Sequence, residues 1–293
     1  MITNRTALID DVQRDWRAAG LQGSLLARNL ITGAEFGFDT GLVWPLASVI
    51  KLPIALVIFD AFERGELDAA EPFEIAPQHA TSGPTGVSLF RHPSRVAAED
   101  LLQLSLAVSD NAATDLLLDR FGLEQANARL TELGCPELII RHSMAAIYGT
   151  AAAVTKIGAG LARAGQTRDG HLIEELDPNR ANAGTARALV DLLDRVWTDR
   201  IASPAACARL RGALGRQLVL HRLAVELAAD DVGIFTKTGT FLDLRHEVGV
   251  VQLGDDRIAV AALTRSDVAA FVQLEADFAI GHAARLAVDA VRS

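Results

Sequence analysis

Residues 44–63 read WPLASVIKLPIALVIFDAFE, in which a serine and a lysine interrupt an apolar segment. Ser48 and Lys51 are three residues apart, so a helix would place the hydroxyl and the amine on one face. A serine hydroxyl becomes a good nucleophile when a base removes its proton, and a lysine desolvated by apolar neighbours is a suitable base. The same pair also fits a capped helix with a solvated lysine, so further motifs have to decide between the two interpretations.

Lysine is scarce in this chain. Among the 28 basic residues only Lys51, Lys156 and Lys237 are lysine, and the rest are arginine. Lysine can lose its proton when desolvated, whereas arginine stays charged. A retained lysine therefore indicates a site that needs a tunable amine.

A second polar motif, Ser109-Asp110-Asn111, separates two apolar helical stretches, 101–108 and 112–118. Burying polar groups without partners costs about 1–3 kcal/mol each, so these residues require hydrogen bonds. They fit a helix cap between packed helices. They also fit a site in which Ser109 relays a proton and Asn111 lies near the substrate and Lys51.

A third motif, Lys237-Thr238-Gly239, closes a predicted strand at 233–236. A strand edge offers backbone donors, Thr238 a hydroxyl, Gly239 close approach, and Lys237 a positive charge for a carboxylate. Taken alone, the motif also fits a simple strand end followed by a turn.

The three motifs occur in the order Ser-x-x-Lys, Ser-Asp-Asn and Lys-Thr-Gly, and two of the three lysines fall within them. In this the chain resembles the penicillin-recognising serine hydrolases, and specifically the class A β-lactamase family, over nearly its whole length. The resemblance implies an acyl-enzyme mechanism without a metal or organic cofactor. It makes Ser48 the acylated nucleophile and Lys51 the group that acts in its deprotonation.

The resemblance also implies roles for the remaining motif residues. Ser109 would relay a proton to the β-lactam nitrogen, and Asn111 would order Lys51 and the substrate amide. The other roles are an oxyanion hole made by the backbone N–H groups of Ser48 and Thr240, carboxylate binding by Lys237, Thr238 and Gly239, and a further carboxylate ligand at Arg245 or His246.

The chain departs from the family at the Ω loop, where class A enzymes carry a glutamate that activates the water releasing the acyl group. The corresponding segment, Arg141-His142-Ser143-Met144, holds no acid, and Met144 stands about where the glutamate belongs. The Glu-x-x-x-Asn spacing occurs later, from Glu175 to Asn179. Either an insertion at 145–170 delays the loop and Glu175 is the base, or the base is absent, which is the placement we favour.

Hydrophobic periodicity predicts an α/β (α+β) fold, and its order of elements matches that of the family. We expect an antiparallel sheet flanked by terminal helices, formed by 1–43 and 200–293 together, with an all-helical lobe inserted at 44–199. The predicted helices are 7–19, 54–63, 98–108, 112–121, 123–133, 186–197 and 272–291, and the predicted strands are 24–30, 35–39, 233–236, 246–253 and 257–263.

Composition and charge exclude some classes of binding partner. The net charge is −9 and no basic tract occurs, so we expect no nucleic acid. The apolar runs are too short to cross a bilayer, and the chain as written lacks a leader, which predicts a cytoplasmic protein unless a leader was removed. Cys135 and Cys207 fit no metal-ligand spacing and are expected to be buried or incidental thiols.

The expected partner is a small molecule, a β-lactam or a related amide or ester bearing a carboxylate. The sequence leaves open an esterase or D,D-peptidase on the same site, and a penicillin-acylated sensor that releases its acyl group slowly. It makes no prediction of the oligomeric state.

Overall fold

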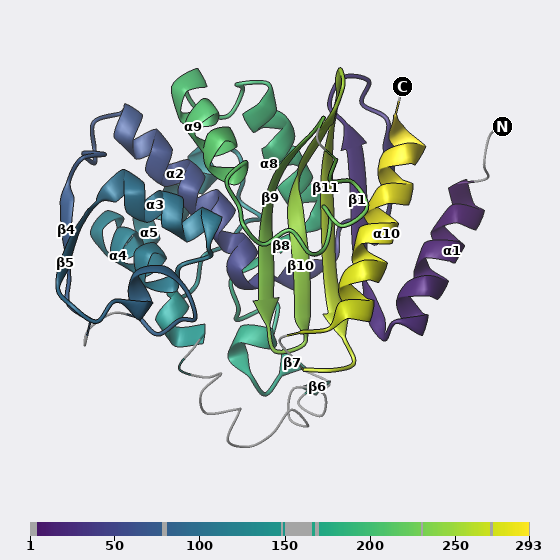
Figure 1. Ribbon diagram of the computed structural model, residues 1–293, viewed down its shortest axis with the longest axis horizontal. Coiled ribbons are helices and arrows are strands. Elements are labelled where there is room, and N and C mark those ends of the chain that lie inside the picture. Colours follow the sequence, from purple (N-terminus) through teal and green to yellow (C-terminus); the bar gives the residue numbers. More distant parts are fainter. Residues whose placement is uncertain are drawn as a thin grey trace.

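A five-stranded antiparallel sheet joins the two ends of the chain (Figure 1). The computed structural model describes residues 5–77, 81–147, 149, 166–167, 170–229, 231–269 and 272–292. The strand order is β2-β1-β11-β10-β9, so the N-terminal strands lie against the C-terminal ones. Their bounds are β1 (Leu21–Asn29), β2 (Glu35–Phe38), β9 (Val232–Phe241), β10 (Leu244–Leu253) and β11 (Asp256–Ser266).

The sheet is covered on both faces, because alternate residues of one strand enter two hydrophobic clusters. Along β11, Ile258, Val260 and Ala262 belong to one cluster, while Ala259 and Ala261 belong to the other. The first cluster includes the terminal helices α1 (Arg5–Ala18) and α10 (Leu274–Val291), which lie side by side in Figure 1. The predicted sheet with flanking terminal helices is confirmed.

The second cluster joins the sheet to the helices of the central part of the chain. Helix α2 (Lys51–Glu63) is apolar all round and is buried from Lys51 to Ala61, as expected for a helix inside a bundle. It contacts helices on several sides. The bounds of the others are α3 (Ala98–Ala107), α4 (Asn111–Phe121), α5 (Leu123–Glu132), α8 (Ala186–Trp197) and α9 (Pro204–Leu214).

Helices form most of the described part of 44–199, but short strands occur there as well. They are β4 (Pro72–Ile75) with β5 (Ser94–Ala97), β6 (Gln166–Thr167) with β7 (Gly170–His171), and β3 (Val43–Pro45) with β8 (Ala183–Thr185). The expectation of helices throughout was too strict, because strands of two to four residues offer too few positions for alternation to be visible. Helix α8 contacts β1 and β11 as well as α9, and the two-lobe division stays a prediction.

Three further sequence predictions concern single features. Both cysteines are buried thiols. Within the described residues no helix is long and apolar enough to cross a membrane. Most of the suggested insertion at 145–170 lies outside the described part of the chain.

Candidate active site

Ser48 lies in η1 (Ala47–Ile50), a turn of 3₁₀ helix that leads directly into α2. Ala47 before it has a φ of 44°, in the left-handed region that non-glycine residues adopt only when the surroundings impose it. The surroundings here include a bond from the Leu46 N–H to the Asn182 carbonyl at 2.8 Å. Leu46, Ala47, Val49 and Ile50 are buried, whereas Ser48 is partly exposed. The strained turn thus presents the serine to solvent.

A pocket of about 100 Å³ opens beside Ser48 and brings all three motifs together. Four of the residues predicted for the site line it: Ser48, Ser109, Thr238 and Thr240. The other described residues of its wall are Pro84, Thr85, Val108, Val219 and His221.

Lys51 is fully buried directly beneath this pocket wall. Its Nζ donates to the Ser109 carbonyl at 2.7 Å and to Asn111 Oδ1 at 2.7 Å, and lies 3.3 Å from Ser109 Oγ. Burial lowers the pKa of Lys51 to about 7, although the charges of Asp110 and Asp115 oppose the shift. The amine is therefore neutral in a large fraction of molecules at neutral pH, as a base must be.

This pKa predicts the pH dependence of any reaction in which Lys51 takes the Ser48 proton. A protonated amine has no lone pair to accept it, so the acylation rate should rise with pH through about 7 and level off above. Pseudo-first-order acylation rates from about pH 5 to about pH 9 would show this limb. A profile that is flat across this range would argue against Lys51 as the base.

Among the described residues no hydrogen bond joins Lys51 to Ser48. The proton transfer therefore requires the amine to turn from its present partners.

The Ser109-Asp110-Asn111 motif forms the helix cap that the sequence suggests, and its serine and asparagine contact Lys51. Asp110 caps α4 by accepting from the Ala113 N–H at 3.2 Å, and it also accepts from the Val87 N–H at 2.7 Å. Ser109 has a left-handed φ of 57°, which separates α3 from α4. The cap and this turn direct Ser109 and Asn111 toward Lys51.

The Lys237-Thr238-Gly239 motif lies on β9, the edge strand of the sheet. Lys237 is fully buried, and its Nζ donates to Ser109 Oγ at 3.1 Å and to the Thr238 carbonyl at 2.8 Å. Burial and the charge of Lys51 lower the pKa of Lys237 well below its ordinary value. The Ser109 hydroxyl consequently lies between two lysine amines.

Gly239 allows β9 to lie against the serine turn. A Cβ at this position would be 2.9 Å from the Leu46 carbonyl oxygen and 2.9 Å from Val49 Cγ2. Both neighbours belong to the packed segment around Ser48, so a side chain would push the strand away from the nucleophile.

Arg245 and His246 do not occupy the position predicted for them, and neither lines the pocket. Both side chains are fully buried. Arg245 pairs with Asp277 of α10 at 2.6 Å. His246 Nδ1 accepts from the Thr264 N–H at 2.9 Å, so its Nε2 carries the proton and donates to the Pro45 carbonyl at 2.8 Å. Burial lowers the pKa of His246 to about 3, which keeps it neutral. Both side chains are buried because β10 is an interior strand of the sheet, which is covered on both faces.

Asp277 pairs with two buried guanidiniums, those of Arg222 and Arg245. Arg222 Nε donates to its carboxylate at 2.8 Å, and Arg245 Nε donates to it at 3.0 Å. Removing one partner of a buried ion pair leaves charge uncompensated. We expect Asp277→Asn to lower the free energy of unfolding by about 3–5 kcal/mol in urea denaturation. Asp289→Asn, which removes an exposed partner of Arg285 on the same helix, is the matched control and should cost about 0–1 kcal/mol. Equal, small effects of the two substitutions would refute a structural role for the buried pair.

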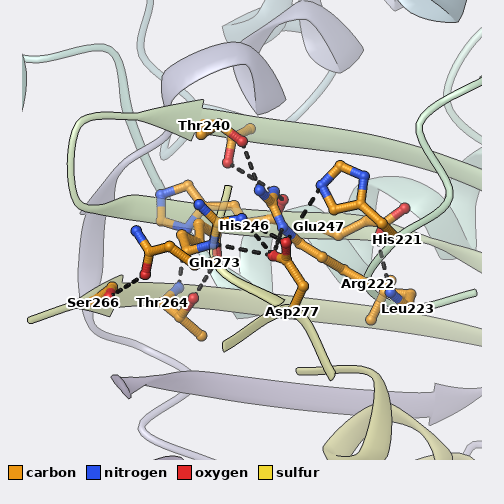
Figure 2. A network of polar contacts seen from close by, with 12 residues as sticks. His221, Arg222, Leu223, Thr240, His246, Glu247, Thr264, Ser266, Gln273 and Asp277 are labelled. Atoms are coloured by element: carbon orange, nitrogen blue, oxygen red, sulfur yellow. Dashed lines mark hydrogen bonds and ion pairs between the residues drawn. The ribbon is translucent and has the colours of Figure 1, made fainter. Parts of the chain in front are cut away.

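Two residues at the site were not anticipated, His221 and Arg222. Arg222 is fully buried; its Nη2 donates to Thr240 Oγ1 at 2.7 Å, and its Nη1 donates to the Gly239 and His246 carbonyls (Figure 2). These hydrogen bonds hold the end of β9 in place beside the pocket. The available signal was two adjacent basic residues in the otherwise apolar stretch 218–225, but their partners are far away in sequence.

The described residues predicted for the Ω loop do not line the pocket. Asn182 Oδ1 accepts from the Arg141 and His142 N–H groups, which closes the neck of the loop. Met144 is buried in the hydrophobic core, and its N–H donates to Asp115 Oδ1 at 2.7 Å. Glu175 is buried in η4 (Glu174–Leu176). Neither Met144 nor Glu175 lines the pocket, and the role of Glu175 stays a prediction.

No group of three or more potential metal ligands is found among the described residues.

The model of the β-lactamase enzyme family matches residues 7–291. The chain belongs to the β-lactamase enzyme family. The chain is similar to the β-lactamase regulatory protein BlaB of Streptomyces cacaoi. The two are 41% identical over 308 aligned residues, which cover 99% of both chains.

Solved structures share the fold of this chain. PBP-A superposes with a TM-score of 0.78 at 22% identity, covering 97% of this chain and 96% of that one. A mutant of PBP-A has been solved as an acyl-enzyme complex with penicillin G. A β-lactamase from Sphaerobacter thermophilus also gives 0.78, at 20% identity and 97% coverage of both chains. The predicted family and fold are confirmed.

Proposed function

We propose that this protein is a serine acyl-transfer hydrolase that reacts with β-lactams by forming an ester at Ser48. The observation that carries the proposal is the buried amine of Lys51, one helical turn from a serine that follows the strained Ala47 and lies at the wall of a pocket. Desolvation makes that amine a base at neutral pH. No metal or organic cofactor takes part in the proposed reaction.

In the proposed acylation, neutral Lys51 takes the hydroxyl proton of Ser48. The Ser48 oxygen bonds to the lactam carbonyl carbon, and the backbone N–H groups of Ser48 and Thr240 stabilise the oxyanion. When the carbon–nitrogen bond breaks, the nitrogen takes the hydroxyl proton of Ser109, and the Lys51 ammonium returns to Ser109 the proton that it took from Ser48. The Ser109 hydroxyl is placed for this relay because it lies 3.3 Å from Lys51 Nζ and 3.1 Å from Lys237 Nζ.

The substrate carboxylate would meet the hydroxyls of Thr238 and Thr240, which line the pocket. Behind them, buried Arg222 supplies positive charge, a favourable environment for an anion, because a guanidinium stays protonated even when it is buried. Asn111 holds Lys51 and is the predicted partner of the substrate amide. On the proposed two-lobe division, Ser48 and Ser109 come from 44–199 and the two threonines from 200–293, so the substrate binds between the lobes.

Release of the acyl group is expected to be slow. Hydrolysis of the ester needs a base aimed at a water molecule, and no carboxylate belongs to the described pocket wall. This observation favours a second candidate, a sensor that reacts with a β-lactam and keeps the acyl group. The 41% identical relative named as a β-lactamase regulatory protein supports it.

Excess chromogenic cephalosporin separates these functions. We expect a burst of about one equivalent, followed by slow turnover, because ester formation outruns hydrolysis. Brisk, sustained consumption would refute slow release, and the absence of a burst together with the absence of turnover would refute acylation. Cleavage of a small ester or D-amino-acid peptide at a higher rate would favour the esterase or D,D-peptidase alternative.

Glu175 can be tested in the same assay. Because its side chain does not line the pocket, Glu175→Gln should leave the slow phase unchanged within a few-fold. Glu174→Gln, on the neighbouring acid that pairs with Arg180, is the matched control. Brisk wild-type turnover that collapses only in Glu175→Gln would identify Glu175 as the base and 145–170 as an insertion.

A further inference from the structure

His221 is the one titratable side chain among the described residues that line the pocket with Ser48. The rest of that wall consists of serine, threonine, proline and valine residues. The His221 side chain is 48% exposed, so its ring is accessible to water and to a bound ligand. None of the three family motifs includes it, and the acylation steps proposed above do not use it.

The segment that carries His221 is anchored at both ends. Before it, the Leu218 N–H donates to the Ala107 carbonyl at 3.0 Å, and Gln217 Oε1 accepts from the Thr238 N–H at 3.1 Å. After it, the Leu223 N–H donates to buried Glu247 at 2.7 Å. The backbone that carries His221 is therefore held against both the helix before Ser109 and the edge strand β9.

Partial burial and the neighbouring guanidiniums favour the neutral form of the His221 ring. Its Nε2 lies 3.7 Å from Asp277 Oδ2, but that carboxylate already pairs with Arg222 and Arg245 (Figure 2). Partial burial lowers the pKa of His221 below its ordinary value of 6.5; the charges of Arg222 and Arg245 lower it further, and Asp277 opposes them. A neutral imidazole has a nitrogen lone pair that can accept a proton.

We propose that His221 accepts the proton of the water molecule that hydrolyses the Ser48 ester. The water oxygen bonds to the ester carbonyl carbon as its proton moves to the imidazole. The bond from that carbon to Ser48 Oγ then breaks, and the imidazolium returns the proton to Ser48. One water molecule is consumed, and the acid product leaves a regenerated enzyme.

The inference rests on the proposed function, because it requires an acyl group on Ser48. It assigns the residual hydrolysis to the wall of the pocket formed by residues 219–221 and β9 rather than to the Ω loop. His221 thereby sets the lifetime of the acyl-enzyme, without a part in its formation.

The test follows release alone. Each protein is acylated with benzylpenicillin, freed of excess reagent, and monitored by intact mass as the adduct disappears. His221→Gln should acylate at the wild-type rate and release about 10²-fold more slowly, the usual effect of removing a general base. His282→Gln is the matched control, since that histidine is also 48% exposed and beside an acid, Glu226, but lies outside the pocket. It should release at the wild-type rate.

Two further readouts separate a base from a structural residue. Wild-type release should slow as the pH falls through the pKa of His221, below 6.5, because the protonated ring accepts nothing, and His221→Gln should lack this limb. Imidazole added to His221→Ala should restore part of the lost rate.

Equal release from the wild type and His221→Gln overturns the inference, and so does a variant that is slow only in acylation. Slow release that imidazole does not accelerate, with an unchanged pH profile, also overturns it. An absence of adduct in both proteins overturns the proposed function, and the inference with it.

Discussion

Lys51→Arg is expected to acylate about as slowly as Lys51→Ala, roughly 10²–10⁴-fold below the wild type, which is the usual range for loss of a general base. Arginine keeps the positive charge but stays protonated at any pH at which the protein is folded. The geometry of the site also disfavours a guanidinium group. The Lys51 amine is fully buried and lies 2.7 Å from both the Ser109 carbonyl and Asn111 Oδ1, a space that a guanidinium exceeds.

Acylation time courses by intact mass would measure this effect. Lys156→Arg, the same exchange outside the three motifs, is the matched control and should acylate at the wild-type rate. Thermal denaturation of each variant would separate a loss of chemistry from a loss of folding. If Lys51→Arg acylates within a few-fold of the wild type, Lys51 acts only as an electrostatic partner.

The sequence predicted the elements that carry the motifs because their signals are local. Apolar periodicity marks α8 at its observed bounds, 186–197, and each motif interrupts or ends such a pattern. The scarcity of lysine added a chemical signal, since a chain that uses arginine for ordinary charge retains lysine at positions 51 and 237. The structure buries both of these amines completely.

Arg245 and His246 show what local signals miss. A basic pair at the start of a strand suggests an exposed strand end, yet both side chains are buried by partners more than thirty residues away or on another strand. Asp277, which binds Arg245, belongs to α10, and Pro45, which binds His246, precedes the serine turn. Nothing near position 245 in the sequence indicates either partner.

The same reason explains why the segment around His221 was missed. Its anchors, Ala107, Thr238 and Glu247, come from α3, β9 and β10. The segment has no helical or strand periodicity of its own, so only the folded chain places it beside Ser48. A side chain that lies next to a nucleophile through such long-range contacts is recognisable only from the structure.

In the proposed mechanism, separate groups account for formation and release of the acyl-enzyme. Formation depends on Ser48, Lys51 and Ser109, which the structure brings together beside one pocket. Release would depend on a base for water; the family resemblance leads one to expect a carboxylate from the Ω loop, whereas the described pocket wall offers the imidazole of His221. A protein of this kind would report β-lactams better than it destroys them.

The central claim, that Ser48 is the acylated nucleophile, is tested most directly by the intact mass of the protein after incubation with benzylpenicillin. The wild type should gain the mass of one penicilloyl group, and peptide mapping should place it on Ser48. Ser94→Ala, which removes a partly exposed serine hydroxyl outside the pocket, should gain the same mass, whereas Ser48→Ala should gain none. An adduct of unchanged yield on Ser48→Ala would contradict the account.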